Sequence, residues 1–293
     1  LIRRQSAGPA TQRQLATAAG ASLDLIGVDL GVPRFPPLAH SVDDDTIALY
    51  HLDDAPGAAA VEDFTGRFPN RQGHNGVLSG TATLGAPGRF GPAVAFAGPG
   101  AVTVATDPVF NLPAAASLTA ECFVRTEAEI PDARVLARRG ATGRGWSIEI
   151  GEFGRGLARA VRATVSDGTN QLVLHSDGSL PVDRFTHLAL VVDRAEGAVS
   201  LWVDGQRADV QDGTALGALT AAVPLVIGPG NGTLRAVVDE VRISRTARAG
   251  FAPVLGEGDE HYRRRLRIFR HWVLPTPSGL AAVLNGAVGS IGG

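Results

Sequence analysis

The sequence lacks several residue types, and each absence narrows what the protein can be. Its 293 residues include no lysine, no methionine and one cysteine, Cys122. A single cysteine cannot form an internal disulfide, and no motif pairs a histidine with it. Because its surroundings, SLTAECFVRT, have the pattern of a strand, we expect a buried thiol and not a nucleophile. The lack of methionine even at position 1 indicates a fragment or a processed chain.

Long hydrophobic runs and a strong excess of charge are also absent. No apolar run reaches the ~20 residues that a membrane span needs. The formal net charge of −2 offers nothing to attract nucleic acid or an anionic membrane, and all 27 basic residues are arginines. A hydrophobic content of 44% is enough to bury a core. The composition therefore indicates an ordinary globular protein with no membrane span and no nucleic-acid partner.

What the sequence does contain, from about residue 46 to residue 245, is strand-like alternation with turn signals at short intervals. This pattern predicts a mainly β fold, a two-sheet antiparallel jelly-roll sandwich. HLALVVD (187–193) and AVSLWVDG (198–205) predict a hairpin joined by RAEG. Asp204 and Asp177 are each followed by glycine, a pair that tolerates the positive φ of tight hairpin turns.

One carboxylate falls on an apolar face of a predicted strand. Alternation along AVVDEVRIS (236–244) places Asp239 with three aliphatic residues, and a buried carboxylate without a partner costs several kcal/mol. Its partner is either an arginine or a set of backbone N–H groups, or else it is a calcium ion. Calcium takes oxygen ligands from scattered loops, so Asp53 and Asp63 are the further candidate ligands. Calcium is the only cofactor that the sequence suggests.

Residues 44–250 resemble a laminin-G-like, concanavalin A-like jelly roll. The matching motifs are an aromatic residue before an acidic loop (Tyr50, Asp53), an Asp-x-x-Gly turn (Asp63, Gly66), a Phe-Gly-x-Ala-x-x-Phe strand (90–96), a His-Leu-Ala strand (187–189), a Trp-Val-Asp-Gly hairpin (202–205) and a Val-Asp-Glu-Val-Arg-Ile strand (238–243). The resemblance implies two antiparallel sheets, a glycan- or protein-binding role as in many members, and a bound metal as in some.

Catalysis is not expected. Glucanases with this fold carry Glu-x-Asp-x-x-Glu on one strand, and the nearest text here, WSIEIGEF (146–153), lacks the central aspartate. Glu149 and Glu152 are three apart, so a strand would point them to opposite faces. Glycan sites use flat aromatic faces, and Trp146 beside Arg144 is the candidate ligand-binding pair, with core or rim packing as the alternative for Trp146.

The two flanks have helical patterns instead. Apolar residues recur at steps of three and four over residues 11–32, with Thr11 as the cap. GEGDEHYRRRLRIFRHWV predicts a second helix whose apolar stripe is Tyr262, Leu266, Phe269 and Val273 and which ends at Pro275. TPSGLAAVL (276–284) predicts a further helix after it.

When the two flanks are read as one continuous sequence without the jelly roll, they resemble the baseplate-J-like wedge proteins of phage tails and contractile injection machines. The matching residues are Leu23, Asp24, Gly27, Gly31, Val32, Pro33 and Arg34, followed by Gly256, Glu257, Asp259, Tyr262, Arg263, Arg265 and Leu266. We therefore predict a helical domain in two halves, residues 1–40 and 251–293, interrupted by a jelly roll at residues 41–250. Exposed loops with neighbouring ends tolerate such insertions.

The leading hypothesis is a non-enzymatic baseplate subunit that carries the jelly roll as a binding or bracing module. Its partners are then other baseplate and tail subunits and a cell-surface glycan, in a particle assembled in the bacterial cytoplasm. The residues predicted to form the assembly interface are Arg34, Tyr262, Arg263, Arg265 and Leu266, since arginine suits subunit contacts. The alternative is an exported, extracellular lectin or adhesin without a particle.

Overall fold

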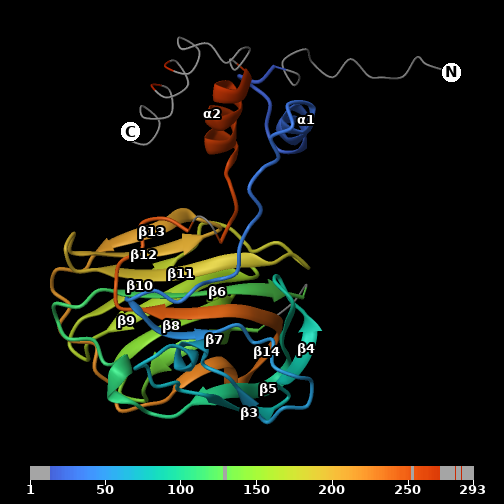
Figure 1. Ribbon diagram of the computed structural model, residues 1–293. Helices are drawn as coiled ribbons and strands as arrows, with labels where there is room; N and C mark the ends of the chain where they lie inside the picture. Colours follow the sequence, from blue (N-terminus) through green and yellow to red (C-terminus); the bar gives the residue numbers. More distant parts are fainter. Residues whose placement is uncertain (1–13, 128–130, 252–253, 271–280, 282–284, 286–293) are drawn as a thin grey trace. The chain divides into compact units, whose positions relative to one another are not determined.

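The computed structural model describes residues 14–127, 131–251 and 254–270, and also residues 281 and 285. The chain divides into two compact units. The helical unit is formed by Leu1–Leu38 and Ala252–Gly293, and the jelly-roll unit is Ala39–Phe251 (Figure 1). In the described part of the chain, no helix has both the length and the hydropathy to cross a membrane.

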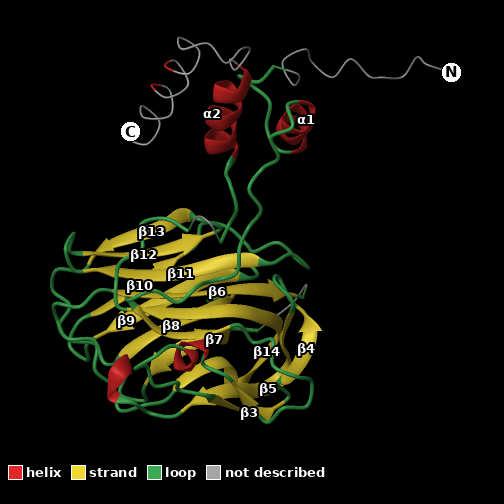
Figure 2. Cartoon of the chain, in the orientation of Figure 1, coloured by secondary structure: helices red, strands yellow, loops and turns green. Residues whose placement is uncertain are grey.

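The jelly-roll unit is built almost entirely of antiparallel strands, as predicted (Figure 2). Its strands are β1 (Thr46–Tyr50), β2 (Ala60–Val61), β3 (Gly76–Gly80), β4 (Thr83–Pro87), β5 (Pro92–Val104), β6 (Leu118–Thr126), β7 (Ala133–Arg139), β8 (Gly145–Gly151), β9 (Ala160–Ser166), β10 (Gln171–His175), β11 (Thr186–Asp193), β12 (Ala198–Val203), β13 (Gln206–Asp212) and β14 (Leu225–Ser244). Two short 3₁₀-helices, η2 (Phe64–Arg67) and η3 (Pro108–Phe110), lie in loops between them.

The strands form two packed layers that share one hydrogen-bonded network. One layer runs β10-β9-β8-β7 and meets the first part of β14 at Val226 and Ile227. The other runs β13-β12-β11-β6 and meets the second part of β14, residues 236–244. β5 follows β14 through both parts, so these two long strands connect the layers.

A single hydrophobic core lies between the layers. Alternate residues of each strand supply it, such as Ile148 and Ile150 of β8 and Leu188 and Leu190 of β11. Each such side chain contributes about 1.5–3 kcal/mol on burial. Cys122 belongs to this core and is fully buried, which raises the pKa of its thiol. The predicted buried thiol is therefore confirmed.

Of the predicted turns, one is confirmed and one is wrong. β11 and β12 form the predicted hairpin, with Leu190 opposite Leu201. Asp204 and Gly205 both have positive φ, 46° and 73°, in the tight turn from β12 to β13. Asp177 does not begin a hairpin turn, because β10 and β11, which are described throughout, lie in different layers and the chain crosses between them.

β14 departs from strict alternation at Asp239 and Glu240. A bulge interrupts its pairing with β6, and Glu240 has a φ of 52°. Before the bulge the even-numbered residues, such as Val238, face the core, and after it the odd-numbered residues, such as Val241, do so. The single apolar face predicted for 236–244 is therefore wrong, because one extra residue changes which side chains point inward. Both carboxylates are nevertheless buried.

The helical unit contains α1 (Ala21–Asp29) and α2 (Asp259–Arg270). α1 is shorter than the helix predicted over 11–32, because Gly20 precedes it with a φ of 51°, outside the helical range. Leu23, Tyr262 and Leu266 are fully buried in a small core of this unit. The predicted residues that lie outside the described part of the chain are Thr11, Val273, Pro275 and, apart from residue 281, the helix predicted over 276–284.

Hydrogen bonds tie the two segments of the helical unit together. The Arg34 guanidinium donates to a carboxylate oxygen of Asp24 and to one of Asp259, each at 2.7 Å. The Tyr262 hydroxyl donates to the Val32 carbonyl at 2.6 Å. The Arg34–Asp259 and Tyr262–Val32 bonds join residues that lie on opposite sides of the jelly roll in the sequence, so the two segments form one unit.

Several residues predicted as an assembly interface are used inside this unit. Tyr262 and Leu266 have no exposed surface, so their side chains cannot contact another subunit, and the prediction is corrected for these two. Arg263 donates to the Ala18 carbonyl, and Arg265 pairs with Glu257 at 2.6 Å. Both arginines, like Arg34, keep part of their surface exposed, and an assembly role for the three arginines stays a prediction.

Candidate ligand-binding site

Asp63 organises the loops beside β1. Its Oδ1 accepts hydrogen bonds from the Leu49 N–H at 3.0 Å, the Thr65 N–H at 3.1 Å and the Thr65 hydroxyl at 2.8 Å, and Asp63 thereby caps η2. Its Oδ2 accepts from the His74 N–H at 2.9 Å. The carboxylate is 1% exposed, and these donors compensate for its burial. Asp63 therefore fixes three segments of chain relative to one another.

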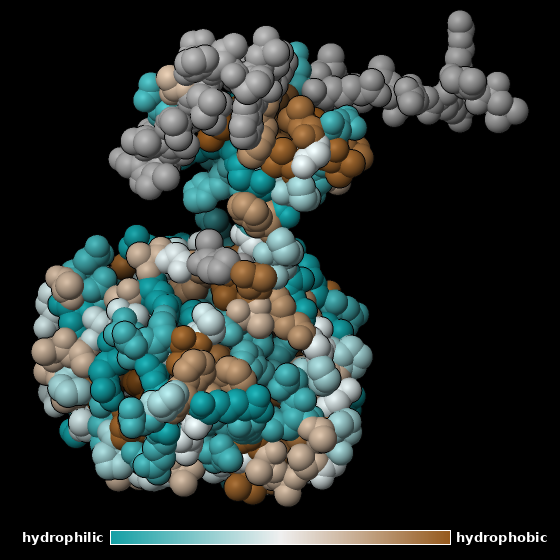
Figure 3. Space-filling view, viewed as in Figure 1, coloured by the Kyte–Doolittle hydropathy of each residue, from teal (hydrophilic) through white to brown (hydrophobic). Residues whose placement is uncertain are grey.

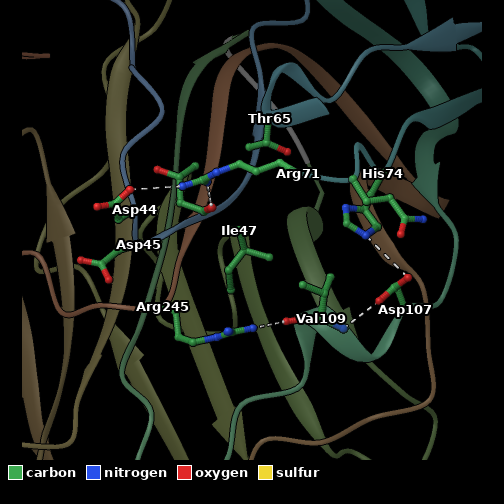
Figure 4. Close-up of a pocket in the computed structure, with 11 residues that line it drawn as sticks. Asp44, Asp45, Ile47, Thr65, Arg71, His74, Asp107, Val109 and Arg245 are labelled. Atoms are coloured by element: carbon green, nitrogen blue, oxygen red, sulfur yellow. Dashed lines mark hydrogen bonds and ion pairs between the residues drawn. The ribbon is translucent and has the colours of Figure 1, made fainter. Parts of the chain in front are cut away.

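An open hollow of about 440 Å³ lies over these loops. Figure 4 shows its polar side chains arranged around Ile47. They are Asp44, Asp45, Thr46, Thr65, Arg71, Gln72, His74, Asp107 and Arg245. The start of β1, the loop after η2, the start of η3 and the end of β14 each contribute to the lining.

Hydrogen bonds hold much of this lining in place. Arg71 donates to the Thr46 carbonyl at 2.8 Å, and Arg245 donates to the Val109 carbonyl, also at 2.8 Å. On the far side of Ile47, His74 Nε2 lies 3.6 Å from an Asp107 carboxylate oxygen. The hollow is thus preformed and offers both donors and acceptors, which suits a hydrophilic ligand.

The visible surface of the jelly-roll unit is also largely hydrophilic. In Figure 3 the visible face of the jelly-roll unit is mostly hydrophilic, with hydrophobic side chains in small separate patches. No broad apolar patch is visible on this face that would mark a hydrophobic partner.

The three predicted calcium ligands are not brought together. Asp63 is occupied by the donors named above, and Asp53 is exposed. Asp239 is 1% exposed, and its Oδ2 accepts from the Arg89 N–H at 2.6 Å and the Phe90 N–H at 3.1 Å. The alternative partner predicted for Asp239, a set of backbone N–H groups, is therefore confirmed. Among the described residues, these three aspartates form no group with the spacing of a metal site.

The predicted ligand-binding pair is separated by the fold. Trp146 is 2% exposed and lies in the main core, so its ring cannot stack on a ligand, and the structure corrects that role. Arg144 precedes β8 and is exposed. The alternative given for Trp146, core packing, is the one that the structure shows.

A second hollow of about 510 Å³ lies beside Glu149 and residues 229–232 of β14. Glu149 is 7% exposed and forms hydrogen bonds with Arg162, whose guanidinium lies over the Phe153 ring at 4.0 Å. Glu152 follows β8 in an exposed turn. The two glutamates therefore occupy different surroundings.

A buried cluster of His40, Glu121 and His187 lies on the outer face of the layer that contains β6 and β11. Glu121 and His187 are on the strand faces opposite to the core residues Cys122 and Leu188. One ligand atom from each cluster residue lies within 4.8 Å of the other two, and this is the only such group of three in the described part of the chain. It is the candidate metal centre of the protein.

Burial and charge set the protonation of this cluster. Burial lowers the pKa of His40 to about 3, even though the charge of Glu121 opposes that shift, so the ring is neutral at pH 7. Burial raises the pKa of Glu121, but the His187 hydrogen bond and the nearby Arg242 charge outweigh it and bring the pKa down to about 2. The cluster therefore presents a carboxylate beside a neutral imidazole.

Neither the hollow nor the cluster was found from the sequence. Their residues come from segments far apart in the chain, with no spacing that marks a motif. The only signal was the His-Leu-Ala strand, which included His187 as part of a family resemblance and gave it no chemical role.

The architecture defines the class of this protein, an antiparallel jelly-roll sandwich of the lectin and glucanase type. Residues 97–250 match a laminin G family model, described as the concanavalin A-like lectin/glucanases superfamily. The chain belongs to this superfamily, and the resemblance predicted for the jelly roll is confirmed. The match does not extend to α1 or α2, so the resemblance of the flanks to baseplate proteins stays a prediction.

Solved structures share the fold at low sequence identity. The binding domain of Paraclostridial Mosquitocidal Protein 1 is 11% identical with a TM-score of 0.52, over 76% of this chain and 52% of that chain. Domain 4 of AbnA, a GH43 extracellular arabinanase from Geobacillus stearothermophilus, in complex with arabinotriose, is 18% identical with a TM-score of 0.51, over 76% of this chain and 98% of that chain.

The Botulinum neurotoxin serotype D binding domain is 10% identical with a TM-score of 0.52, over 78% of this chain and 52% of that chain. The match thus spans about half the length of the two toxin binding domains. At these identities the similarity shows the fold alone. No match was found among curated proteins.

Proposed function

We propose that this chain is a non-catalytic binding subunit. Its jelly roll takes a hydrophilic ligand, a glycan, in the hollow around Ile47, and its helical unit anchors it in a baseplate of a phage-tail-like contractile injection particle. One observation carries this proposal: a complete jelly roll separates two sequence segments that together build one helical unit. Such an arrangement is typical of a binding module inserted into a scaffold.

The residues behind the baseplate resemblance are those that build the helical unit. Arg34 joins Asp24 to Asp259, and Tyr262 binds the Val32 carbonyl. Gly27 has no room for a side chain, because a Cβ there would lie 1.5 Å from the Tyr262 hydroxyl oxygen. The shared motif is thus a structural requirement of this packing, which supports a common fold for the flanks.

The helical unit also exposes apolar side chains. Leu25 and Val28, one turn apart on α1, are 67% and 68% exposed, and Phe35 is 60% exposed. Exposed apolar groups gathered on a small unit favour contact with another protein subunit. This supports an anchoring role for the unit.

The ligand proposal rests on the polar lining of the hollow and on what the fold relatives bind. Domain 4 of AbnA is in complex with arabinotriose, and the toxin relatives are binding domains. We propose the absence of catalysis because Glu149 is held by Arg162 and lies apart from Glu152, so they do not form the pair of carboxylates that glycoside hydrolysis uses.

The anchoring role is tested by purifying the full-length gene product from its native cells. We expect sheath, tube and spike proteins to accompany it in rod-shaped particles under negative stain. A Leu25→Asp, Val28→Asp variant should lose these partners, and Asp29→Ala on the same helix should keep them. A protein that purifies alone would refute the baseplate role and favour the alternative, an exported lectin without a particle.

Ligand binding is tested on the purified chain with a glycan array followed by calorimetry. A Gln72→Ala variant, in the hollow, should bind the best glycan at least about tenfold more weakly, which is a loss of about 1.4 kcal/mol. Gln206→Ala, an exposed glutamine on β13, is the matched control and should bind like the wild type. No bound glycan, or equal binding by both variants, would contradict the proposed site.

A further inference from the structure

The buried cluster on the outer face of the β6 and β11 layer carries more unsatisfied polar atoms than packing explains. His40 is 4% exposed, yet neither of its ring nitrogens has a hydrogen-bond partner. His187 has no exposed surface, and its Nδ1 also lacks a partner. Buried polar groups are nearly always hydrogen-bonded in native proteins, so the His40 ring, whose Nε2 lies 3.7 Å from Glu121 without a hydrogen bond, points to a missing ligand.

The distances in this cluster leave room for a metal ion shared by the three side chains. Glu121 Oε2 lies 2.9 Å from His187 Nε2 and 3.7 Å from His40 Nε2. The second distance is too long for a hydrogen bond. Two ligand atoms at about 2.0–2.1 Å from a tetrahedral zinc ion are about 3.3 Å apart. The observed values lie on either side of that separation, so small side-chain shifts would bring the atoms to it.

We propose that His40, Glu121 and His187 bind a divalent transition-metal ion of the zinc type. Two imidazoles and one carboxylate are a donor set that zinc accepts, whereas calcium prefers oxygen ligands alone. This site is independent of the proposed glycan hollow and of the predicted aspartates. The ion would join the segment before β1 to two strands of one layer, so its role is structural.

The Arg242 guanidinium completes the surroundings of the carboxylate. It lies 2.8 Å from Glu121 Oε1, the oxygen that does not face the histidines, and fixes the orientation of the carboxylate as outer partners of metal ligands do. Arg248 lies 3.7 Å from the same oxygen and pairs with Asp43 at 2.8 Å. Glu240 accepts a hydrogen bond from the backbone N–H of His40 at 2.7 Å.

These charges set the expected strength of binding. Glu121, Asp43 and Glu240 are negative, and Arg242 and Arg248 are positive. The two guanidiniums repel a cation, so the affinity should be weaker than that of a thiolate site. Two aromatic rings shield the cluster, with the Phe251 ring 4.7 Å and the Phe123 ring 5.0 Å from the His187 ring. We therefore expect the ion to enter during folding and to exchange slowly afterwards.

The test uses the untagged full chain, refolded from denaturant with zinc or cobalt and then desalted. We expect about one ion per chain by elemental analysis and, with cobalt, visible absorption bands of a low-symmetry site. His40→Phe should reduce the bound metal at least about tenfold. His261→Gln, an exposed histidine on α2, is the matched control and should bind as much metal as the wild type.

His40→Phe is chosen because it keeps a ring of similar size and removes no hydrogen bond, so the metal-free variant should fold. If the variant does not fold, a zinc-edge anomalous map of wild-type crystals decides the question. A peak between the three side chains would support the site. An ordered water there, no metal in the refolded wild type, or equal metal in His40→Phe would each overturn it.

Discussion

The surroundings of Asp63 and of Glu121 differ in how completely their polar atoms are paired. Both carboxylates are buried in the jelly-roll unit, and each lies near a histidine. Asp63 accepts hydrogen bonds from three backbone N–H groups and one hydroxyl. Beside Asp63 one histidine nitrogen, His74 Nδ1, lacks a hydrogen-bond partner, whereas beside Glu121 three do: both ring nitrogens of His40 and Nδ1 of His187.

This difference teaches which buried charges are structural and which point to a ligand. Asp63 was a candidate metal ligand from its sequence, but its neighbours already use its oxygens. Glu121 was not a candidate, yet its surroundings have the unused donor atoms that a metal needs. If the proposed metal site is real, incomplete hydrogen bonding at a buried charge is a better marker of a ligand site here than residue type.

The largest effect should come from removing the fully paired carboxylate. Asp63→Ala leaves the N–H groups of Leu49, Thr65 and His74 without their acceptor, and the free energy of unfolding should fall by about 3–5 kcal/mol. Urea unfolding followed by tryptophan fluorescence measures it. Asp53→Ala, at an exposed aspartate of the predicted calcium set, should change stability by less than about 0.5 kcal/mol. If Asp63→Ala lowers the free energy of unfolding by less than about 1 kcal/mol, the hydrogen bonds to Asp63 do not stabilise the fold as proposed.

Asp239 is a third buried carboxylate, and it accepts fewer hydrogen bonds than Asp63 does. Burial raises the pKa of Asp239 to about 6, although hydrogen bonds from Phe90 and Arg89 oppose the shift. Because the folded pKa exceeds the ordinary 3.8, the native state holds this proton more tightly than the unfolded state does. The free energy of unfolding therefore falls as pH rises from about 4 to about 6, by up to about 3 kcal/mol.

Asp239→Asn removes this titration, so the measurement is the difference in unfolding free energy between wild type and variant as a function of pH. That difference should decline between about pH 4 and pH 6 and be constant above about pH 7. A difference that does not vary with pH would show that the hydrogen bonds from Arg89 and Phe90 fully compensate for burial.

The two histidines beside Glu121 allow a matched pair of substitutions, whose effects on stability are compared in the metal-free protein. His187→Phe removes the hydrogen bond to Glu121 and should cost about 2 kcal/mol, because a buried charge loses a partner. His40→Phe removes none and should change stability by less than about 1 kcal/mol or increase it. Urea midpoints in the presence of a chelator measure both. Equal losses would mean that His40 makes a polar contact as important as that of His187.

A small effect is expected in the helical unit, where Tyr262 makes a hydrogen bond between two uncharged groups. Tyr262→Phe removes the hydrogen bond to the Val32 carbonyl and leaves the ring in the small core, at a cost of about 1 kcal/mol. Hydrogen exchange of the α2 amides reports it, because a loss confined to this unit need not change the jelly roll. His261→Ala, exposed on the same helix, is the control and should leave the exchange rates unchanged.

Local patterns predicted much of the fold. Alternation gave the strands and the β11–β12 hairpin, and the Asp204-Gly205 pair gave the turn after it, because both depend on residues close together in the chain. Buried positions such as Cys122 followed from the same alternation. The pattern failed at Asp177 and at the bulge beside Asp239, where strand pairing across the layers decides the backbone.

The candidate sites were much less predictable. Trp146 was considered for its residue type, but the position of β8 places it in the core. The hollow around Ile47 is lined by four segments that are far apart in the sequence. The cluster of His40, Glu121 and His187 likewise brings three distant segments together on one outer face. No residue spacing in the sequence predicts that these segments lie close together.

The sequence by itself determined the class of fold and much of the strand pattern, since both depend on short-range periodicity. Only the tertiary structure decided which carboxylates are satisfied and which histidines are left without partners. The physical reason is that hydrogen bonding at a buried charge depends on donors from strands and loops far apart in the chain. Only the packing of the two layers determines which of these donors lie close enough to the charge.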